Sequence, residues 1–354
     1  MVKLPKRYTQ LACPTSGGFG DVICCNDNHL DRKVAIKVIK DIKEEHRLRD
    51  ELVALLQMRS KHVVQVYDIV TLDAGSFGIV EEFVDGGDLW NSDVPRQSPD
   101  TYLSILWQIA SGIADIHAAG LIHRDIKPTN MKLDGERIVK IFDFGLARKG
   151  GADAATKGFI GTYGFAAPEL YGSGKVSFTN AIDTYAFGAT AFFLKCRDLP
   201  PELQKRPPQS VTSGVFSSAP ISIPHDLAVL LERCLAHNFM DRPSMATVRD
   251  ELARHLHRDK HQALAVHSGK PYLFNSTNRS AVLDFPKVGM VEITYDGLKF
   301  FVSQTSGEVY INNSPACSGM EIPGSCVVAL GGAHRKSNER EFITFDVSNP
   351  EVVL

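Results

Sequence analysis

Apolar and polar residues alternate in the N-terminal part of the chain as they do in β-strands. Residues 32–39 place three apolar side chains on one face and two residues, Ala35 and Lys37, on the other. Residues 11–25 indicate a strand, a glycine-rich turn and a second strand, and residues 77–83 indicate a further strand. Leucines recur at helical spacing in residues 43–58. We therefore expect a small β-rich region that contains one helix.

A helical pattern begins at Ser98. Serine is a favoured helix cap, Pro99 fits the first helical position, and Asp100 suits the positive end of a helix. Apolar side chains then recur every three or four residues until Gly120. A second, more uniformly apolar helix is expected from residue 181. Residues 200–224 are rich in Pro, Ser and Gln and predict a connecting loop, although substrate docking is the alternative.

The last part of the chain returns to a β pattern. Short β-rich runs are separated by Gly, Asn, Pro and Ser, and they are VEITY, LKFFVS, EVYIN, CVVAL and EFITFDV. We expect a small all-β sandwich over residues 271–354, preceded by a linker over residues 258–270.

Composition narrows the class of protein. A hydrophobic fraction of 44% in 354 residues supports packed cores, and a net charge of −2 gives no basic field for nucleic acid. No apolar run is long enough for a membrane span, and the N-terminus lacks a secretory pattern. Seven scattered cysteines show no metal-ligand spacing. These features predict a cytoplasmic protein without a nucleic-acid or membrane partner.

The chemistry concentrates in two neighbouring segments. Residues 121–130, LIHRDIKPTN, supply the carboxylate of Asp125, the ammonium of Lys127 and the amide of Asn130. Residues 141–147, IFDFGLA, add the carboxylate of Asp143. Phosphoryl transfer from a nucleotide needs a carboxylate for the hydroxyl proton, a cation for the moving phosphate, and oxygen ligands for magnesium.

These segments match the H-R-D-x-x-x-x-N and D-F-G signatures, so the chain resembles eukaryotic-type (Hanks-type) Ser/Thr protein kinases. We expect a bacterial member. The resemblance implies ATP and Mg²⁺ as cofactors and an α+β, bilobal protein kinase fold. It covers residues 8–257, with a β-rich N-lobe over residues 8–84 and a helical C-lobe over residues 85–257.

The resemblance also assigns the nucleotide-binding residues. A glycine-rich loop over residues 15–22 would cover the phosphates with close backbone amides. Lys37, in a complete V-A-I-K match, would contact the α- and β-phosphates and pair with Glu51, although Glu44 and Glu45 are competing partners. The other assigned positions are Thr15, Gly17 and Gly20 in the loop, Val22 and Ala35 over adenine, Glu82 and Val84 at its edge, and Asp88 at the ribose.

Three positions depart from the family pattern. Thr15 stands where the first loop glycine is usual, Glu81 guards the back of the base pocket, and Lys132 replaces an apolar residue beneath adenine. An unpaired buried carboxylate at Glu81 would be costly, and the sequence offers no account of it. The stem of Lys132 could still cover the base while its charge stays in water.

On the catalytic side, the resemblance makes Asp125 the base and Lys127 the γ-phosphate contact, while Asn130 and Asp143 hold magnesium. Thr162, whose hydroxyl can bridge Asp125 and Lys127, accompanies the Ser/Thr form. The resemblance further implies that Asp183 holds the backbone of the catalytic loop and that Arg242 pairs with Glu169.

Two further residues are predicted to regulate the kinase. Arg124 implies control by a phosphate in the following segment, because guanidinium groups match phosphate geometry. Thr156 is the expected acceptor of that phosphate by autophosphorylation; the alternative is that residues 150–155 form only a mobile loop.

The C-terminal runs faintly resemble a forkhead-associated domain, a fold that reads phosphothreonine. Arg279 and Ser280 are the only candidates for its phosphate ligands, and no S-x-x-H motif accompanies them. Dimerisation, autoinhibition and target docking remain alternative roles for this β-domain, so a homodimer is one expectation.

The leading hypothesis is a Ser/Thr protein kinase that modifies protein substrates and itself, in signalling or defence. The alternative is a catalytically weak scaffold, which Thr15, Glu81 and Lys132 favour. A small-molecule kinase is disfavoured by Thr162 and the Ala-Pro-Glu segment at residues 167–169, which build a shelf for protein substrates.

Overall fold

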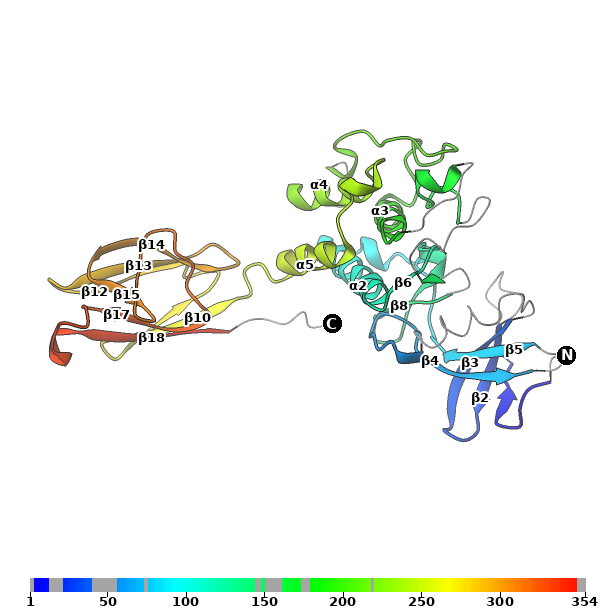
Figure 1. Cartoon of the computed structure of the whole chain (residues 1–354), viewed down its shortest axis with the longest axis horizontal. Helices are drawn as coiled ribbons and strands as arrows, with labels where there is room; N and C mark the ends of the chain where they lie inside the picture. Colours follow the sequence, from blue (N-terminus) through cyan, green and yellow to red (C-terminus); the bar gives the residue numbers. More distant parts are fainter. Residues whose placement is uncertain are drawn as a thin grey trace. The chain divides into compact units, whose positions relative to one another are not determined.

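The chain was analysed as a computed structural model, which describes residues 3–12, 22–39, 56–72, 76–143, 148–149, 161–172, 179–217 and 220–348. It divides into two compact units, Met1–Leu252 and Ala253–Leu354 (Figure 1). The first unit combines a β-sheet with helices, whereas the second is built from strands.

A five-stranded antiparallel sheet opens the first unit, with strand order β1-β2-β3-β5-β4. The apolar face expected for residues 32–39 is confirmed, because Val34, Ile36 and Val38 are all buried. Lys37 lies on the opposite, half-buried face of the same strand. The strands are β1 Tyr8–Gln10, β2 Val22–Asp27, β3 Arg32–Ile39, β4 Val66–Thr71 and β5 Phe77–Glu82.

Helices and short strands form the rest of this unit. The helix predicted from Ser98 is confirmed: Ser98 Oγ accepts the Thr101 amide hydrogen at 3.0 Å, as a helix cap should. The α-helices are α2 Pro99–Ala118, α3 Ala181–Cys196, α4 His225–Cys234 and α5 Met245–Leu256. The short strands are β6 Leu121–Ile122, β7 Met131–Leu133, β8 Val139–Ile141 and β9 Arg148–Lys149.

Single turns of 3-10 helix connect these elements. Those of the first unit are η2 Val94–Arg96, η3 Pro128–Asn130, η6 Pro168–Tyr171, η7 Val215–Ser217 and η8 Phe239–Asp241. The described part of residues 200–224 contains only turns and η7, as a connecting loop should.

A buried arginine joins separate segments of the helical part of the first unit. Both terminal nitrogens of Arg242 donate to the Glu169 carboxylate, at 2.7 and 2.9 Å, and Nη1 also donates to the Ala181 carbonyl at 3.0 Å. The Arg242 side chain has no exposed area. A bidentate pair of this kind fixes η6, which contains Glu169, to Arg242 and through it to the start of α3.

The second unit contains two antiparallel sheets, drawn in yellow to red in Figure 1. A six-stranded sheet has the order β11-β10-β18-β17-β15-β16, and a three-stranded sheet has the order β12-β13-β14. Buried residues from both sheets belong to one hydrophobic core, which includes Ala265, Ile293 and Phe345. The strands are β10 Gln262–His267, β11 Lys270–Phe274, β12 Ser280–Phe285, β13 Gly289–Tyr295, β14 Phe300–Gly307, β15 Val309–Ile311, β16 Ser314–Pro315, β17 Ser325–Leu330 and β18 Glu341–Ser348, with the 3-10 turn η9 Ser337–Glu339.

The expected linker over residues 258–270 is wrong in one respect, because it contains β10. That strand pairs with both β11 and β18, so the β-rich unit begins before residue 271. Alternation in QALAVH places Ala263 and Ala265 in the core, and such small side chains give a weak hydrophobic signal. Strands β11 and β12 were missed for a similar reason, since their faces carry few buried apolar residues.

Two further observations concern the whole chain. Among the described residues, none of the helices combines the length and the apolar character that crossing a bilayer would require. Cys24 on β2 takes part in a disulfide, whereas the other described cysteines are free: Cys25, Cys196, Cys234, Cys317 and Cys326.

Candidate active site

The loop after β6 is fixed by a buried carboxylate. Asp183, in the first turn of α3, accepts the backbone N–H groups of His123 and Arg124, each at 2.8 Å. His117 Nε2 lies 3.0 Å from the same carboxylate. Burial alone would raise the pKa of Asp183, but these hydrogen bonds and the nearby imidazoles outweigh it and lower the pKa. The loop therefore rests on a buried carboxylate whose ionised form is stabilised by its hydrogen-bond partners.

Three side chains form a closed triangle in this loop. Lys127 Nζ lies 2.7 Å from Asp125 Oδ2 and donates to Thr162 Oγ1 at 2.8 Å. Thr162 Oγ1 in turn donates to Asp125 Oδ1 at 2.7 Å. The bridge predicted for Thr162 is thus present, although 35 and 37 residues separate it from its two partners.

Asn130 braces the same carboxylate from the other side. Its Nδ2 atom donates to Asp125 Oδ2 at 2.9 Å and to the Asp125 carbonyl at 2.8 Å. The amide oxygen Oδ1 is buried and has no hydrogen-bond partner among the described residues. A buried amide oxygen without a partner is costly, so this atom is a candidate for a ligand to something the protein binds.

Asp143 belongs to the same group of side chains. Its carboxylate forms an ion pair with Lys37 of β3, which joins the sheet to the catalytic loop. His123 Nε2 lies 3.1 Å from the Phe142 carbonyl, and the Phe142 amide donates to the Asn130 carbonyl at 3.1 Å. The two sequence segments that carry the chemistry are therefore held side by side. We call Lys37, Asp125, Lys127, Asn130, Asp143 and Thr162 the catalytic end of the site.

The catalytic end fits a magnesium ion. Asn130 Oδ1 is an orphaned oxygen, and Asp143 offers a carboxylate that is 19% exposed. Magnesium prefers oxygen ligands and is usually held by one or two carboxylates or amides together with substrate phosphates. Asn130 and Asp143 could hold the ion, which would supply charge neutralisation for phosphate oxygens.

The other end of the site follows β5. Val34 pairs with Glu82 and Ala35 with Glu81 across the sheet, so the β5 exit lies beside the strand that carries Lys37. The Glu82 carboxylate turns to Lys140 Nζ at 2.8 Å and to the Gln65 amide at 3.2 Å. Since its side chain is engaged there, only the backbone of Glu82 can meet a base. No spacing rule in the sequence signals this pair, because 58 residues separate its members.

The Lys132 side chain contacts a backbone carbonyl at the edge that is expected to bind the base. Its Nζ atom donates to the Val84 carbonyl at 3.4 Å and lies 5.8 Å from the centre of the Phe142 ring. Backbone pairing brings the segment after Val84 close to Lys132. The Leu89 amide donates to the Met131 carbonyl at 2.9 Å, and Asp88 and Lys132 form an isolated antiparallel β-bridge. The half-buried Lys132 ammonium thus donates to the protein backbone instead of lying only in water. We call Glu81 to Val84 and Lys132 the base end.

Glu81 is the second departure at the base end. Its side chain is buried, and burial raises its pKa to about 7, although the charge of Lys37 partly offsets this rise. The carboxyl group is therefore largely neutral below neutral pH. The protonated carboxyl group is neutral, and a neutral group can be buried at the back of the base pocket without an ionic partner.

Comparison with known proteins decides the family. A family model described as "Protein kinase domain" matches residues 15–253, which is most of the first unit. The chain belongs to the protein kinase family. The β-rich unit that follows lies outside the matched residues.

Several curated relatives are similar to the kinase part. The chain is 28% identical over 244 residues to "Calcium-dependent protein kinase 6" of Plasmodium berghei, which covers 66% of this chain and 16% of that protein. It is 31% identical to "Maternal embryonic leucine zipper kinase" of Danio rerio, covering 56% and 30%. It is 32% identical to "Mitogen-activated protein kinase 12" of Danio rerio, covering 52% and 53%. The chain thus spans about half, or less, of each relative's length.

The remaining predicted residues divide into two groups. Among the described residues, Val22 pairs with Lys37 across β2 and β3, and Asp88 accepts the Asn91 amide hydrogen at 3.0 Å. Arg124 is buried with a φ of 70°, in the turn that Asp183 holds. The others lie outside the described residues: Thr15, Gly17, Gly20, Glu51 and Thr156.

Proposed function

We propose that this member of the kinase family transfers the γ-phosphate of ATP to serine and threonine hydroxyls of proteins, itself included. The triangle of Asp125, Lys127 and Thr162 carries the proposal. It presents a carboxylate oxygen and an ammonium to one point, and both side chains keep some exposure, 13% and 18%. A signalling or defence role and a bacterial source remain predictions.

Each residue of the catalytic end then has one task. Asp125 orients the substrate hydroxyl and receives its proton, and Lys127 neutralises charge on the transferred group. Thr162 and Asn130 hold Asp125 in place. Asn130 and Asp143 supply oxygens for magnesium, and Lys37 binds the nucleotide phosphates. Magnesium and ATP supply the electrophilic phosphorus and its charge neutralisation when they are bound.

Incubation of the full chain with labelled ATP, magnesium and a generic protein tests the proposal. We expect label in substrate and in the chain itself, located by phosphoamino-acid analysis on serine and threonine. Asp125→Asn should lower the rate about 10³-fold, because it removes the proton acceptor while keeping its shape. Glu136→Gln, at an exposed turn, is the matched control. Label on tyrosine, or equal rates in Asp125→Asn and the unmodified chain, would contradict the assignment.

A catalytically weak scaffold is the second candidate. The hydrogen bond from Lys132 to the Val84 carbonyl supports it, because this bond occupies a backbone acceptor expected for the base. The two candidates differ in nucleotide affinity. A scaffold should show no saturable binding of a fluorescent ATP analogue up to millimolar concentration, with or without magnesium.

For the β-rich unit we propose a protein-docking role of the forkhead-associated kind. Two sheets around one core support a sandwich of that kind. Arg279 is a poor phosphate ligand as it stands, since its Nη2 atom lies 2.6 Å from Asp259 Oδ1. Phosphothreonine peptides should therefore bind weakly, and more tightly to Asp259→Asn. Equal titration curves for phosphorylated and unphosphorylated peptides would reject phosphate reading, leaving dimerisation or autoinhibition.

Regulation through Thr156 completes the proposal. Arg124 would receive its phosphate, and Thr156→Ala should then lower activity whereas Thr156→Asp should partly restore it. Mass spectrometry that finds no phosphate on Thr156 in the fully active chain would reject this step.

A further inference from the structure

The loop after α3 carries an arginine that is stacked on the segment beside the catalytic triangle. The guanidinium carbon of Arg206 lies 3.6 Å from the centre of the Tyr163 ring, a cation–π contact. Tyr163 directly follows Thr162, whose hydroxyl touches both Asp125 and Lys127. The positive charge is thereby fixed one residue away from the catalytic end.

This positive charge is exposed and free to meet a ligand. Arg206 is exposed, and within the described ranges it has no ion pair. The Tyr163 side chain is half exposed, at 50%, and the Tyr171 ring lies 6.3 Å from it. A guanidinium that is held flat on an aromatic ring keeps its N–H edge available and loses little freedom on binding.

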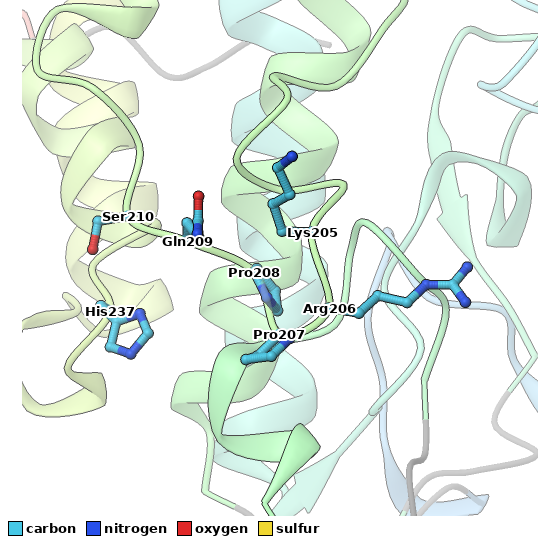
Figure 2. Close-up of a pocket in the computed structure, with 7 residues that line it drawn as sticks. All are labelled: Lys205, Arg206, Pro207, Pro208, Gln209, Ser210 and His237. Atoms are coloured by element: carbon cyan, nitrogen blue, oxygen red, sulfur yellow. The ribbon is translucent and has the colours of Figure 1, made fainter.

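The described segments that carry Arg206 and Tyr163 contain no carboxylate close to either residue in sequence. Residues 203–217 contain neither Asp nor Glu, and neither do residues 161–168. The same loop borders an open pocket of about 580 Å³ whose lining includes Lys205 and His237 but no acidic residue. Arg206 also lines this pocket, and in Figure 2 its side chain extends away from Ser210 and His237. The nearest acidic residues in sequence are engaged elsewhere: Glu202 with Thr212 and Glu169 with Arg242.

We propose that Arg206, held over Tyr163, selects protein substrates that carry an anionic side chain within a few residues of the phosphorylated hydroxyl. This inference rests on the proposed kinase activity, since the substrate hydroxyl must reach Asp125. A carboxylate or an already phosphorylated residue presents the same chemistry to the guanidinium edge, namely oxygens spaced for two hydrogen bonds.

A peptide set separates these possibilities. One serine peptide is varied at each of the flanking positions to Gln, Glu, phosphoserine or Lys, and kcat/KM is measured with the unmodified full chain. We expect Glu to exceed Gln by about 5-fold at one or two positions, the size of a single exposed charge pair. Whether phosphoserine exceeds Glu identifies the source of the anion.

Three variants then assign the preference. Arg206→Gln should abolish the ratio of Glu to Gln peptides, and Arg206→Glu should reverse it in favour of Lys. A merely structural role for Arg206 would not reverse the preference. Arg233→Gln, which removes an exposed arginine from α4, should keep the ratio.

Failure of the proposed role of Arg206 and failure of the kinase assignment give different results. Transfer into neutral peptides with a flat profile, or an unchanged ratio in Arg206→Gln, overturns the role of Arg206 and leaves the kinase assignment intact. No transfer into any peptide and no autophosphorylation overturns both.

Discussion

The catalytic end and the base end of the site lie on the same scaffold, but they differ in how they satisfy their polar groups. At the catalytic end, Asp125 receives hydrogen bonds from Thr162 and Asn130 and an ion pair from Lys127. At the base end, the buried carboxyl of Glu81 shifts its pKa to about 7, and Lys132 takes a backbone carbonyl.

The difference separates two requirements of a kinase. Under the proposed function, the charges at the catalytic end are held in place before phosphate and magnesium bind, and such preorganisation is a large term in catalysis. At the base end, the Lys132 ammonium already donates to the Val84 carbonyl, and competition for that acceptor would lower the affinity for a base. Under the proposed function, the chain would combine effective chemistry with weak nucleotide binding.

Among the variants considered, loss of the Asn130 amide should lower the catalytic rate most. Asn130→Ala removes both donors to Asp125 and the orphaned oxygen Oδ1. We expect kcat to fall about 10³-fold, because a brace and a metal ligand are lost together. Titration with magnesium should also show a higher concentration at half-maximal rate.

Asn130→Asp separates the two tasks of this residue. It keeps an oxygen for magnesium but replaces the donor to Asp125 with a second carboxylate, so the rate should fall while the magnesium dependence stays close to that of the unmodified chain. A normal magnesium requirement in Asn130→Ala would show that Oδ1 is not a ligand.

Replacement of Glu81 tests the base end through pH. Its folded pKa, about 7, lies above the ordinary value of 4.5. The stability contributed by this group is therefore full below pH 4.5 and is lost as the pH rises through 7. Glu81→Gln should remove that loss and raise the unfolding free energy at pH 8 by up to about 3 kcal/mol.

Urea unfolding of the full chain at pH 5 and pH 8 measures this effect. The gain should be largest at pH 8 and small at pH 5, whereas Glu136→Gln at an exposed turn should show neither. A gain of equal size at both pH values would mean that packing, and not ionisation, causes the difference in unfolding free energy between Glu81→Gln and the unmodified chain.

How far the sequence predicts this molecule also differs between the two ends. At the catalytic end, the resemblance to kinase motifs predicts that Asp125, Lys127, Asn130 and Asp143 act together, because all four belong to two short signatures. At the base end, the contact between Lys132 and Val84 depends on side-chain reach across paired backbones, which spacing does not encode.

The β-rich unit shows a related limit of prediction. Strongly apolar runs predict strands such as β17 and β18, whereas the pattern of β10 does not, because its buried positions are Ala263, Ala265 and His267. The stack of Arg206 on Tyr163 was likewise beyond prediction, since residues 43 positions apart share no pattern.

A smaller effect should follow removal of the Thr162 hydroxyl. Thr162→Ala takes one hydrogen bond from each of two charged groups, Asp125 and Lys127, which still pair with each other at 2.7 Å. We expect kcat to fall about 30-fold, the cost of roughly 2 kcal/mol for a hydrogen bond to charge. Thr162→Ser should recover most of this rate; equal losses in both variants would point to the methyl group and its packing instead.

The smallest effect, and the one of opposite sign, is expected at Lys132. Lys132→Leu frees the Val84 carbonyl and gives the base an apolar surface, so the Kd of a fluorescent ATP analogue should fall about 10-fold, or roughly 1.4 kcal/mol. The value of kcat should change less than the Kd, because Lys132 lies outside the catalytic end. Lys132→Arg, which keeps a donor at this position, is the matched control and should bind the analogue as the unmodified chain does. Weaker binding in Lys132→Leu would show that the ammonium contacts the nucleotide, and the base end would then be specialised rather than weakened.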